Sequence, residues 1–295
     1  MIYEKWRELN INPFDIKFNN IKIKEIISYP PAGNDVVECI CDVNSKSENV
    51  YIKIERSKVC DFVTEVNNLN YLLNNNVYLK VPKVYESGIF NEKNYMVLSK
   101  VEGIRLSDII NKGVDLKTKN SLLYKYGKEL SLIHDIPINN FNIAKQRIIN
   151  SCPKNDIYKD LSNVKELEKY IDYLKKNEPE IEFDTFIHGD FHYGNILWKN
   201  NEINGVIDWE YSGKGFKEQD IAWACILRPG QKFMDNIDDI KCFLDGYLEK
   251  GNFDKELFRW CLINGYCHFY LMNINNEDYK KKVFELIEII KDFKM

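Results

Sequence analysis

Alternation of apolar and polar residues dominates the first hundred residues of the chain. In residues 50–54, for example, Val50, Ile52 and Ile54 fall on one face and Lys53 falls on the other. This period of two predicts half-buried strands, and turn-forming Gly, Pro and Asn residues separate the alternating stretches. We therefore expect a small, mostly β region. Its predicted strands are residues 21–29, 36–43, 50–54, 84–90 and 94–101.

A spacing of three or four residues between apolar positions appears after residue 61. Phe62, Val66, Leu69 and Leu73 follow this spacing, and Asp61 can cap the helix that they predict. From about residue 102 the chain is predicted to be mostly helical, although residues 139–182 are polar and show no recognisable chemistry. The further predicted helices are one that begins at residues 106–110, one at residues 116–135 and one that begins with Asp220 as its N-cap, and residues 164–174 form an amphipathic stretch.

Composition places the chain among ordinary globular proteins. It has 295 residues, of which 44% are hydrophobic and 29% charged, and its formal net charge is −4. A chain of this length can bury a sizeable core in one large or two modest domains. No dense basic run is present, so we do not expect a nucleic-acid partner.

Neither a membrane span nor a disulfide framework is expected. The N-terminus lacks the apolar core of a signal peptide, and the longest notable apolar run, residues 221–227, is far shorter than the roughly 20 residues that a span needs. The eight cysteines contain no C-x-x-C pair, and Cys39 and Cys41 would point to the same face of one strand. Reduced core thiols in a cytoplasmic protein are the favoured interpretation.

One segment, residues 187–210, concentrates polar residues that carry chemistry. Asp190 and Asn195 have the spacing D-x-x-x-x-N, and Asp208 follows 18 residues after Asp190 in an apolar run. Mg²⁺ prefers carboxylate and amide oxygens, and phosphoryl transfer needs a carboxylate that orients the acceptor hydroxyl and takes its proton. The segment therefore predicts a phosphoryl-transfer site, with Asp190 as the base and Asn195 and Asp208 as magnesium ligands. Turn residues of a hairpin are the alternative.

The histidines that flank Asp190 raise the alternative of a metal site. His188 and His192 form the pattern H-x-D-x-H with it, but no further Cys or His lies nearby in the sequence to complete the usual ligand set of zinc. We therefore interpret His188 as a residue that shapes the loop. For His134 we favour a packed or capping role over a catalytic one.

A second candidate site pairs Lys53 with Glu65. Glu65 lies within the apolar stripe of the helix after residue 61, three residues after Phe62 and four before Leu69. An unpaired buried carboxylate is costly, so Glu65 needs a partner, and Lys53 is the natural one. Such a pair would hold the α- and β-phosphates of a nucleotide, as it does in kinases. A solvated lysine and a helix-edge glutamate are the alternative.

The motifs HGDFHYGNIL at residues 188–197 and IDWE at residues 207–210 resemble the aminoglycoside phosphotransferase and choline kinase superfamily. Its small-molecule kinases share the protein-kinase-like fold. The resemblance implies a bilobal α+β architecture. Residues 1–101 would form a nucleotide-binding lobe, a small antiparallel β-sheet with one helix, and residues 102–295 a larger, mainly helical lobe for catalysis and acceptor binding.

The same resemblance implies further contacts. It places adenine against the Ser99 carbonyl and the Val101 amide, where a strand ends, and gives Asp220 the role of bracing the catalytic loop. The turn at residues 30–35 could hold phosphates through Asn34, although a plain hairpin explains the same residues. The candidates for contact with the acceptor are Glu210, His192 and Trp223.

The implied activity is that of a Mg²⁺-dependent kinase that transfers the γ-phosphoryl group of ATP or GTP to a hydroxyl of a small cationic acceptor. An aminoglycoside or a related antibiotic is the first candidate, and choline, ethanolamine or another cationic metabolite is the alternative. An inactive nucleotide-binding module is disfavoured because every candidate residue is present. A protein kinase is disfavoured because too few residues lie between Asp208 and Asp220 for an activation loop and no A-P-E-like segment follows.

Residues of the C-terminal region leave the acceptor open. Acidic side chains there would attract ammonium groups, and an aromatic box would suit a quaternary amine. However, the aromatic residues are also spaced as helical core residues are. They are Phe243, Tyr247, Trp260 and Tyr270.

Overall fold

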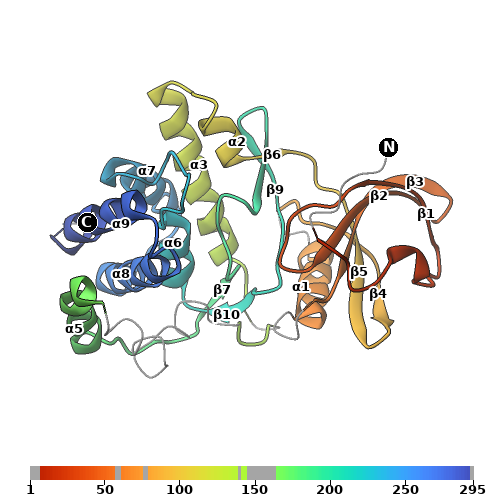
Figure 1. Cartoon of the computed structure of the whole chain (residues 1–295), viewed down its shortest axis with the longest axis horizontal. Coiled ribbons are helices and arrows are strands. Elements are labelled where there is room, and N and C mark those ends of the chain that lie inside the picture. Colours follow the sequence, from red (N-terminus) through yellow and green to blue (C-terminus); the bar gives the residue numbers. More distant parts are fainter. Residues whose placement is uncertain (1–6, 57–60, 76–78, 139–140, 145–163, 293–295) are drawn as a thin grey trace. The chain divides into compact units, whose positions relative to one another are not determined.

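The structure is a computed structural model that describes residues 7–56, 61–75, 79–138, 141–144 and 164–292 (Figure 1). The chain divides into two compact units. The first comprises Met1–Glu102 and Gly205–Glu210, and the second comprises Gly103–Asn204 and Tyr211–Met295. The chain therefore crosses from one unit to the other three times.

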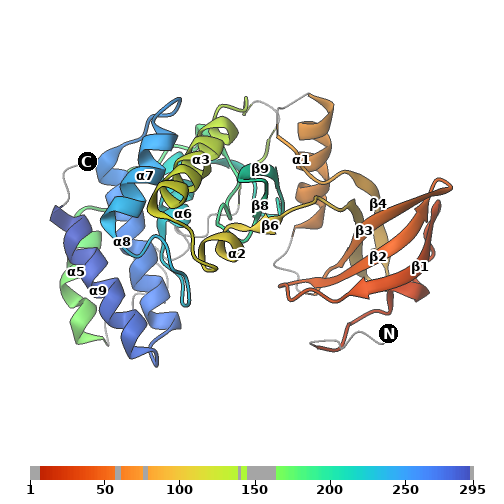
Figure 2. The same ribbon diagram turned by 90° about the horizontal axis from the view of Figure 1, so that it is seen from above.

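A five-stranded antiparallel sheet with the strand order β1-β2-β3-β5-β4 forms most of the first unit (Figure 2). All five predicted strands are present. Val50, Ile52 and Ile54 are fully buried, as their alternation predicts. The strands are β1 (Ile21–Ser28), β2 (Asp35–Val43), β3 (Lys46–Ile54), β4 (Val84–Phe90) and β5 (Lys93–Ser99), and a 3₁₀ turn, η1 (Pro13–Asp15), precedes them.

Strand β3 begins four residues earlier than predicted. Asn44 and Ser45 have φ values of 49° and 66°, as the two central residues of a tight type I′ hairpin turn do. This turn brings Lys46 opposite Val43, so the ladder includes the polar residues before Val50. Backbone pairing, which the side-chain pattern does not reveal, sets this strand end.

Helix α1 (Phe62–Asn74) packs against β4 and β5. Asp61 caps it as predicted, because its Oδ1 accepts a hydrogen bond of 3.0 Å from the Thr64 N–H. Leu69 and Glu65 are both buried on the helix face that meets the sheet. The helix therefore brings a carboxylate into the interior of the first unit.

Helices make up most of the second unit. Figure 2 shows α5, α8 and α9 side by side. The amphipathic stretch at residues 164–174 forms η3 and most of α5, whereas residues 139–140 and 145–163 of the polar segment lie outside the described residues. The elements are α2 (Leu106–Ile110), α3 (Leu116–His134), η3 (Lys165–Leu167), α5 (Glu168–Lys176), α6 (Lys217–Cys225), α7 (Ile237–Tyr247), α8 (Lys255–Met272) and α9 (Glu277–Asp292).

Helices α3 and α7 lie in close contact at two glycines, Gly127 on α3 and Gly246 on α7. A Cβ atom at Gly127 would lie 1.9 Å from the Phe243 carbonyl oxygen, and one at Gly246 would lie 1.9 Å from the Tyr124 carbonyl oxygen. Both clashes involve backbone atoms, which cannot rotate away. The contact between these two helices therefore requires glycine at both positions.

Short strands flank the segment that carries the predicted chemistry. Strand β7 (Thr185–Ile187) pairs with β10 (Gly213–Gly215), and a second small sheet has the order β6-β8-β9. Strand β10 has three residues, too few to show alternation in the sequence. The bounds of the second sheet are β6 (Ile104–Arg105), β8 (Ile196–Lys199) and β9 (Glu202–Val206).

The start of helix α6 differs from the prediction. The helix begins at Lys217 with Phe216 as its N-cap, so Asp220 lies inside the first turn and does not cap it. Residues 218–225 are all buried. Without a polar face, the segment offers no helical period from which its first residue could be read.

The core of the second unit accounts for the aromatic residues near the C-terminus. Phe243, Tyr247, Trp260 and Tyr270 are all at most 1% exposed, so they are core residues. The described cysteines are free thiols and five of the six are buried, while Cys60 and Cys152 lie outside the described residues. Among the helices that the structure describes, none has the length and apolar character needed to cross a membrane.

Candidate active site

The loop after β7 is held by a buried carboxylate. Asp220 is fully buried, and its two oxygens accept hydrogen bonds from the backbone N–H groups of His188 (2.7 Å) and Gly189 (2.9 Å). Gly189 has a φ of 77°, and a Cβ atom there would lie 2.1 Å from the Tyr211 carbonyl oxygen. His188 Nδ1 accepts a hydrogen bond of 3.2 Å from the Asp190 N–H. These contacts fix the backbone that carries Asp190.

The carboxylate of Asp190 is oriented from two sides. Its Oδ1 accepts a hydrogen bond of 2.7 Å from the indole N–H of Trp223. Asn195 Nδ2 donates to the Asp190 carbonyl oxygen at 3.0 Å and to Oδ2 at 3.3 Å. His192 Nε2 lies 3.9 Å from the same Oδ2. The sequence-predicted base thus lies beside Asn195, His192 and Trp223, three other predicted site residues.

His134 belongs to the support of this loop. Its Nδ1 lies 2.8 Å from the Tyr247 hydroxyl, and its Nε2 lies 3.5 Å from Asp220 Oδ2. As the last residue of α3, it links that helix to the carboxylate that holds the loop. It is packed, as predicted.

A cavity of about 320 Å³ opens at Asp190, and we call it the Asp190 cavity. Its lining combines aromatic and aliphatic surface with a few polar groups. Of the lining residues that the structure describes, Asp190 is the one carboxylate and Arg228 the one group with a permanent positive charge. The lining residues are Asp190, His192, Trp223, Arg228, His268, Phe269 and Met272.

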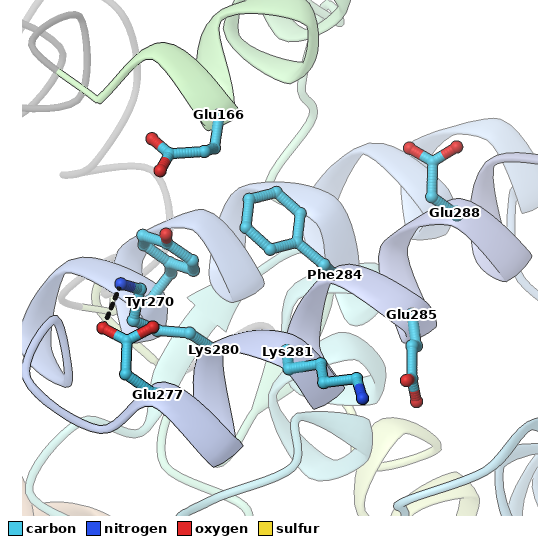
Figure 3. Close-up of a pocket in the computed structure, with 8 residues that line it drawn as sticks. All are labelled: Glu166, Tyr270, Glu277, Lys280, Lys281, Phe284, Glu285 and Glu288. Carbon is cyan, nitrogen blue, oxygen red and sulfur yellow. Dashed lines mark hydrogen bonds and ion pairs between the residues drawn. The ribbon is translucent and has the colours of Figure 1, made fainter.

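A larger hollow of about 570 Å³ lies among η3, α8 and α9 and contains none of the predicted site residues (Figure 3). Its charges largely compensate one another. Lys280 pairs with Glu277 at 2.8 Å and lies over the ring of Tyr270 at 5.4 Å, and Glu288 pairs with Lys169 at 2.6 Å. We therefore place the candidate site at the smaller Asp190 cavity.

The first unit gathers three carboxylates around one ammonium group, and we call Lys53, Glu65, Asp208 and Glu210 the lysine cluster. Lys53 Nζ lies 2.7 Å from Glu65 Oε2, 2.7 Å from Asp208 Oδ1 and 3.2 Å from Glu210 Oε2. The predicted pair of Lys53 and Glu65 is present. Burial alone would lower the pKa of Lys53, but the three carboxylates raise that pKa well above its usual value. Lys53 is therefore fully charged.

Backbone strain marks Asp208. Its φ of 66° lies in the left-handed region, which costs energy for a residue that is not glycine. Burial raises the pKa of Glu65, the Lys53 ammonium lowers it, and the neighbouring carboxylates raise it again. Three carboxylates this close together favour the binding of a cation.

The donor set of the lysine cluster fits Mg²⁺. One oxygen from each of Glu65, Asp208 and Glu210 lies within 4.8 Å of the others, and Mg²⁺ prefers such hard oxygen ligands. Asn195, the other predicted ligand, uses its N–H₂ group on Asp190 and keeps its amide oxygen for other contacts. Bound there, Mg²⁺ would neutralise phosphate oxygens.

Residues 61–242 match the model of the phosphotransferase enzyme family. The chain belongs to this family. Its fold is similar to solved aminoglycoside phosphotransferases, which confirms the predicted protein-kinase-like α+β fold. The apo form of a thermostable mutant of APH(4)-Ia is 16% identical with a TM-score of 0.62, covering 91% of this chain and 94% of that one. The gentamicin complex of APH(2")-IIa is 18% identical with a TM-score of 0.56, covering 92% of each chain.

Relatives of this phosphotransferase family member match over short segments. A probable aminoglycoside 3'-phosphotransferase of Lactococcus lactis is 31% identical over 62 residues, which is 21% of this chain and 24% of that protein. Acyl-CoA dehydrogenase family member 10 of Mus musculus is 30% identical over 69 residues, 23% of this chain and 6% of that protein. The match thus spans less than a quarter of either relative.

Asn34, which was predicted to bind phosphate, contacts Glu210, which was predicted to bind the acceptor. Asn34 Nδ2 donates to Glu210 Oε2 at 3.0 Å, and Asn34 Oδ1 accepts from the Arg56 N–H at 3.3 Å. We expected Glu210 to face the acceptor, but its described contacts are with Lys53 and Asn34. It lies in the lysine cluster, and 176 residues separate it from Asn34, so no local pattern could have revealed this.

The contacts of the Ser99 carbonyl and the Val101 amide with adenine remain a prediction. Ser99 is the last residue of β5, and it exchanges two hydrogen bonds of 2.8 Å with the backbone of Lys83. Val101 follows, with its Cγ1 2.6 Å from where a Cβ atom of Gly205 would lie.

No sequence pattern marked Arg228 as a candidate site residue. It is a lone arginine directly after the apolar run that ends at Leu227, and the RPG turn in which it stands was the available signal.

Proposed function

We propose that this chain is a kinase that transfers the γ-phosphoryl group of ATP or GTP to a hydroxyl group of a small molecule with the help of Mg²⁺. The observation that carries the proposal is the Asp190 carboxylate, which lines a cavity and is oriented by Trp223 and Asn195. A positioned carboxylate of this kind can orient an acceptor hydroxyl and take its proton.

The donor side of the proposal rests on the lysine cluster. Lys53 would bind the α- and β-phosphates while Glu65 holds it in place, and Asp208 would bind Mg²⁺, with Asn195 as the second predicted ligand. The 2.7 Å contacts of Lys53 with Glu65 and Asp208 support this assignment. Complexes of solved neighbours with ADP, AMP-PNP and ATP support a nucleotide donor.

An aminoglycoside or a related antibiotic is the first acceptor class to test. The support is that solved neighbours carry streptomycin, gentamicin or hygromycin B, and that one relative bears the name of an aminoglycoside phosphotransferase. Choline and ethanolamine form the second class, which the sequence motif also fits. The proposed compartment is the cytoplasm, where thiols stay reduced.

The test is nucleotide consumption by the purified protein with Mg²⁺. ATP and GTP are each offered with aminoglycosides, other hydroxylated antibiotics, choline and ethanolamine. Acceptor-dependent consumption should fall by roughly 10²- to 10⁴-fold in Asp190→Ala, with nucleotide affinity unchanged. Asp172→Ala, at an exposed position of α5, is the matched control and should keep full activity. Equal consumption by wild type and Asp190→Ala would overturn the proposal.

A further inference from the structure

The Asp190 cavity holds little negative charge for a site that would receive a polycationic acceptor. Among the described residues that line it, Asp190 is the only carboxylate, and the proposed reaction needs this group for the hydroxyl. Within the part of the lining that the structure describes, no second carboxylate is available for an ammonium group. The cavity does contain a guanidinium group, from Arg228.

The guanidinium of Arg228 is held in place and keeps unused donors. Its Nη1 donates to the Ile226 carbonyl oxygen at 3.1 Å, and its Nη2 donates to the Trp223 carbonyl oxygen at 3.2 Å. These bonds use two of its five N–H groups. Among the described residues, no carboxylate forms an ion pair with it. Three N–H donors of a fixed fork therefore remain for a ligand.

Aromatic rings frame this guanidinium. Its Cζ lies 5.1 Å from the ring centre of Trp223, 5.4 Å from that of Phe269 and 5.8 Å from that of Tyr193. The rings exclude water and restrict the rotamer, so the charge is directed and poorly solvated. A poorly solvated cation binds an anionic partner more strongly than an exposed cation does.

The two histidines of the lining add no fixed positive charge. Burial lowers the pKa of His268, which is therefore neutral at pH 7. His192 Nδ1 accepts a hydrogen bond of 3.1 Å from the Gly194 N–H, which places the ring proton on Nε2. Of the described residues that line this cavity, Arg228 is thus the cation that a ligand meets.

We propose that the acceptor carries an oxyanion group, a carboxylate or a phosphate, close to the hydroxyl that is phosphorylated, and that Arg228 binds this group. The planar fork of arginine matches such oxyanions. An acceptor that offers only ammonium groups would bring like charge against Arg228. The proposal rests on the phosphotransferase function proposed above and narrows its acceptor away from simple aminoglycosides and choline.

Phosphoryl transfer to such an acceptor forms one bond and breaks another. The hydroxyl oxygen forms a bond to the γ-phosphorus, and the bond from that phosphorus to the β-phosphate oxygen breaks. The nucleoside diphosphate leaves with the electron pair, and the hydroxyl proton passes to Asp190. Arg228 takes no part in bond making and determines which acceptor is held.

A purely structural role is the competing explanation for Arg228. The carbonyl oxygens of Trp223 and Ile226 lie at the C-terminal end of α6, where a cationic side chain stabilises a helix. Substitution would then lower the melting temperature without changing anion binding. Arg228→Lys and Arg228→Gln separate these roles, because both weaken the cap while only the first keeps the charge.

The first experiment measures anion binding to the full-length protein without turnover. Sulfate is titrated while tryptophan fluorescence is recorded, and Trp223→Phe identifies the signal from the cavity. Saturable sulfate binding is expected in the wild type. Arg228→Gln should weaken it at least about 10-fold, as for the loss of a charge-assisted hydrogen bond, and Arg228→Lys should lie between. Arg105→Gln, at an exposed position, is the matched control.

Three results would overturn the proposal. They are the absence of saturable sulfate binding, equal sulfate binding by the wild type and Arg228→Gln, and tighter binding of tetramethylammonium than of sulfate in the same titration. None of them depends on phosphoryl transfer, so the outcome for Arg228 is independent of the proposed function.

A second experiment uses acceptors in matched sets. Hydroxy acids, their amides and the corresponding amino alcohols are offered with ATP and Mg²⁺. The acids should have the highest kcat/KM, by about 10-fold or more, and Arg228→Gln should remove this preference mainly through KM. A preference for amino alcohols would contradict the inference. If no compound at all is phosphorylated, the proposed function fails while the sulfate titration still decides the role of Arg228.

Discussion

The lysine cluster and the Asp190 cavity differ in the balance of their charged groups. The cluster surrounds one buried ammonium with three carboxylates and therefore has excess negative charge. The cavity contains one carboxylate and one guanidinium among aromatic rings. Carboxylates that lie close together serve cations such as Mg²⁺, whereas a framed guanidinium serves an oxyanion. The comparison teaches that the position of each charge, and not the net charge of −4, indicates what each region binds.

The largest effect is expected from Lys53→Ala, which would break the cluster. Removing the cation leaves three carboxylates near one another, and breaking a buried charge pair costs about 3 to 5 kcal/mol. We expect a large fall in melting temperature at pH 7. Because Mg²⁺ can take the place of the ammonium, Mg²⁺ should raise the melting temperature of this variant more than that of the wild type.

Lys250→Ala, at an exposed position, is the matched control for that comparison. It should melt like the wild type and gain no extra stability from Mg²⁺. Equal responses of Lys53→Ala and the wild type to Mg²⁺ would argue against a cation site at the three carboxylates.

A smaller effect is expected from Trp223→Phe, which tests the cavity alone. The change removes the 2.7 Å hydrogen bond to Asp190 Oδ1 and keeps most of the aromatic surface. Loss of a hydrogen bond to a charged group costs about 1.5 to 3 kcal/mol, so kcat should fall about 10-fold or more. The KM for the nucleotide should stay the same in steady-state kinetics. A change confined to that KM would contradict the separation of the two regions.

The smallest effect is expected from Glu129→Gln. Among the described residues no cation forms an ion pair with Glu129, so this carboxyl group contrasts with those of the lysine cluster. Burial raises the pKa of Glu129 on α3 to about 7. The pKa of Glu129 in the folded state lies above its pKa in the unfolded state. The protonated carboxyl group therefore stabilises the fold below pH 4.5, and this stabilisation is lost as the pH rises through 7. At pH 8 the variant should therefore be more stable than the wild type, by about 1 to 2 kcal/mol.

Chemical denaturation at pH 5 and pH 8 measures this difference. Glu180→Gln, at an exposed position outside the helices, provides the control and should show no pH-dependent gain. A Glu129→Gln variant with the same stability difference at both pH values would show that Glu129 is ionised in the folded protein.

Much of the fold follows from local patterns in the sequence. The alternation around Ile52 specified a buried strand, and the spacing from Phe62 to Leu69 with Asp61 before it specified a capped helix. Each signal lies within a few residues. Where burial is complete on all sides, as in α6, the pattern disappears, and the predicted cap at Asp220 was wrong.

The candidate site divides in the same way. Asp190 and Asn195 are five residues apart, and a motif could place them together. Glu210 meets Asn34 across 176 residues, and Arg228 gains its place from rings of three separate segments. Such neighbours are products of the tertiary fold, so a sequence pattern cannot predict them.

The crossing segment Gly205–Glu210 has a consequence for attempts to divide the protein. Its Val206 N–H donates to the Lys80 carbonyl oxygen at 3.0 Å, and the segment supplies two of the three carboxylates around Lys53. A gene split after residue 102 would give an N-terminal fragment in which Lys53 keeps Glu65 as its only partner from the cluster. Recovery of the proposed nucleotide binding would then report that the fragments had reassembled.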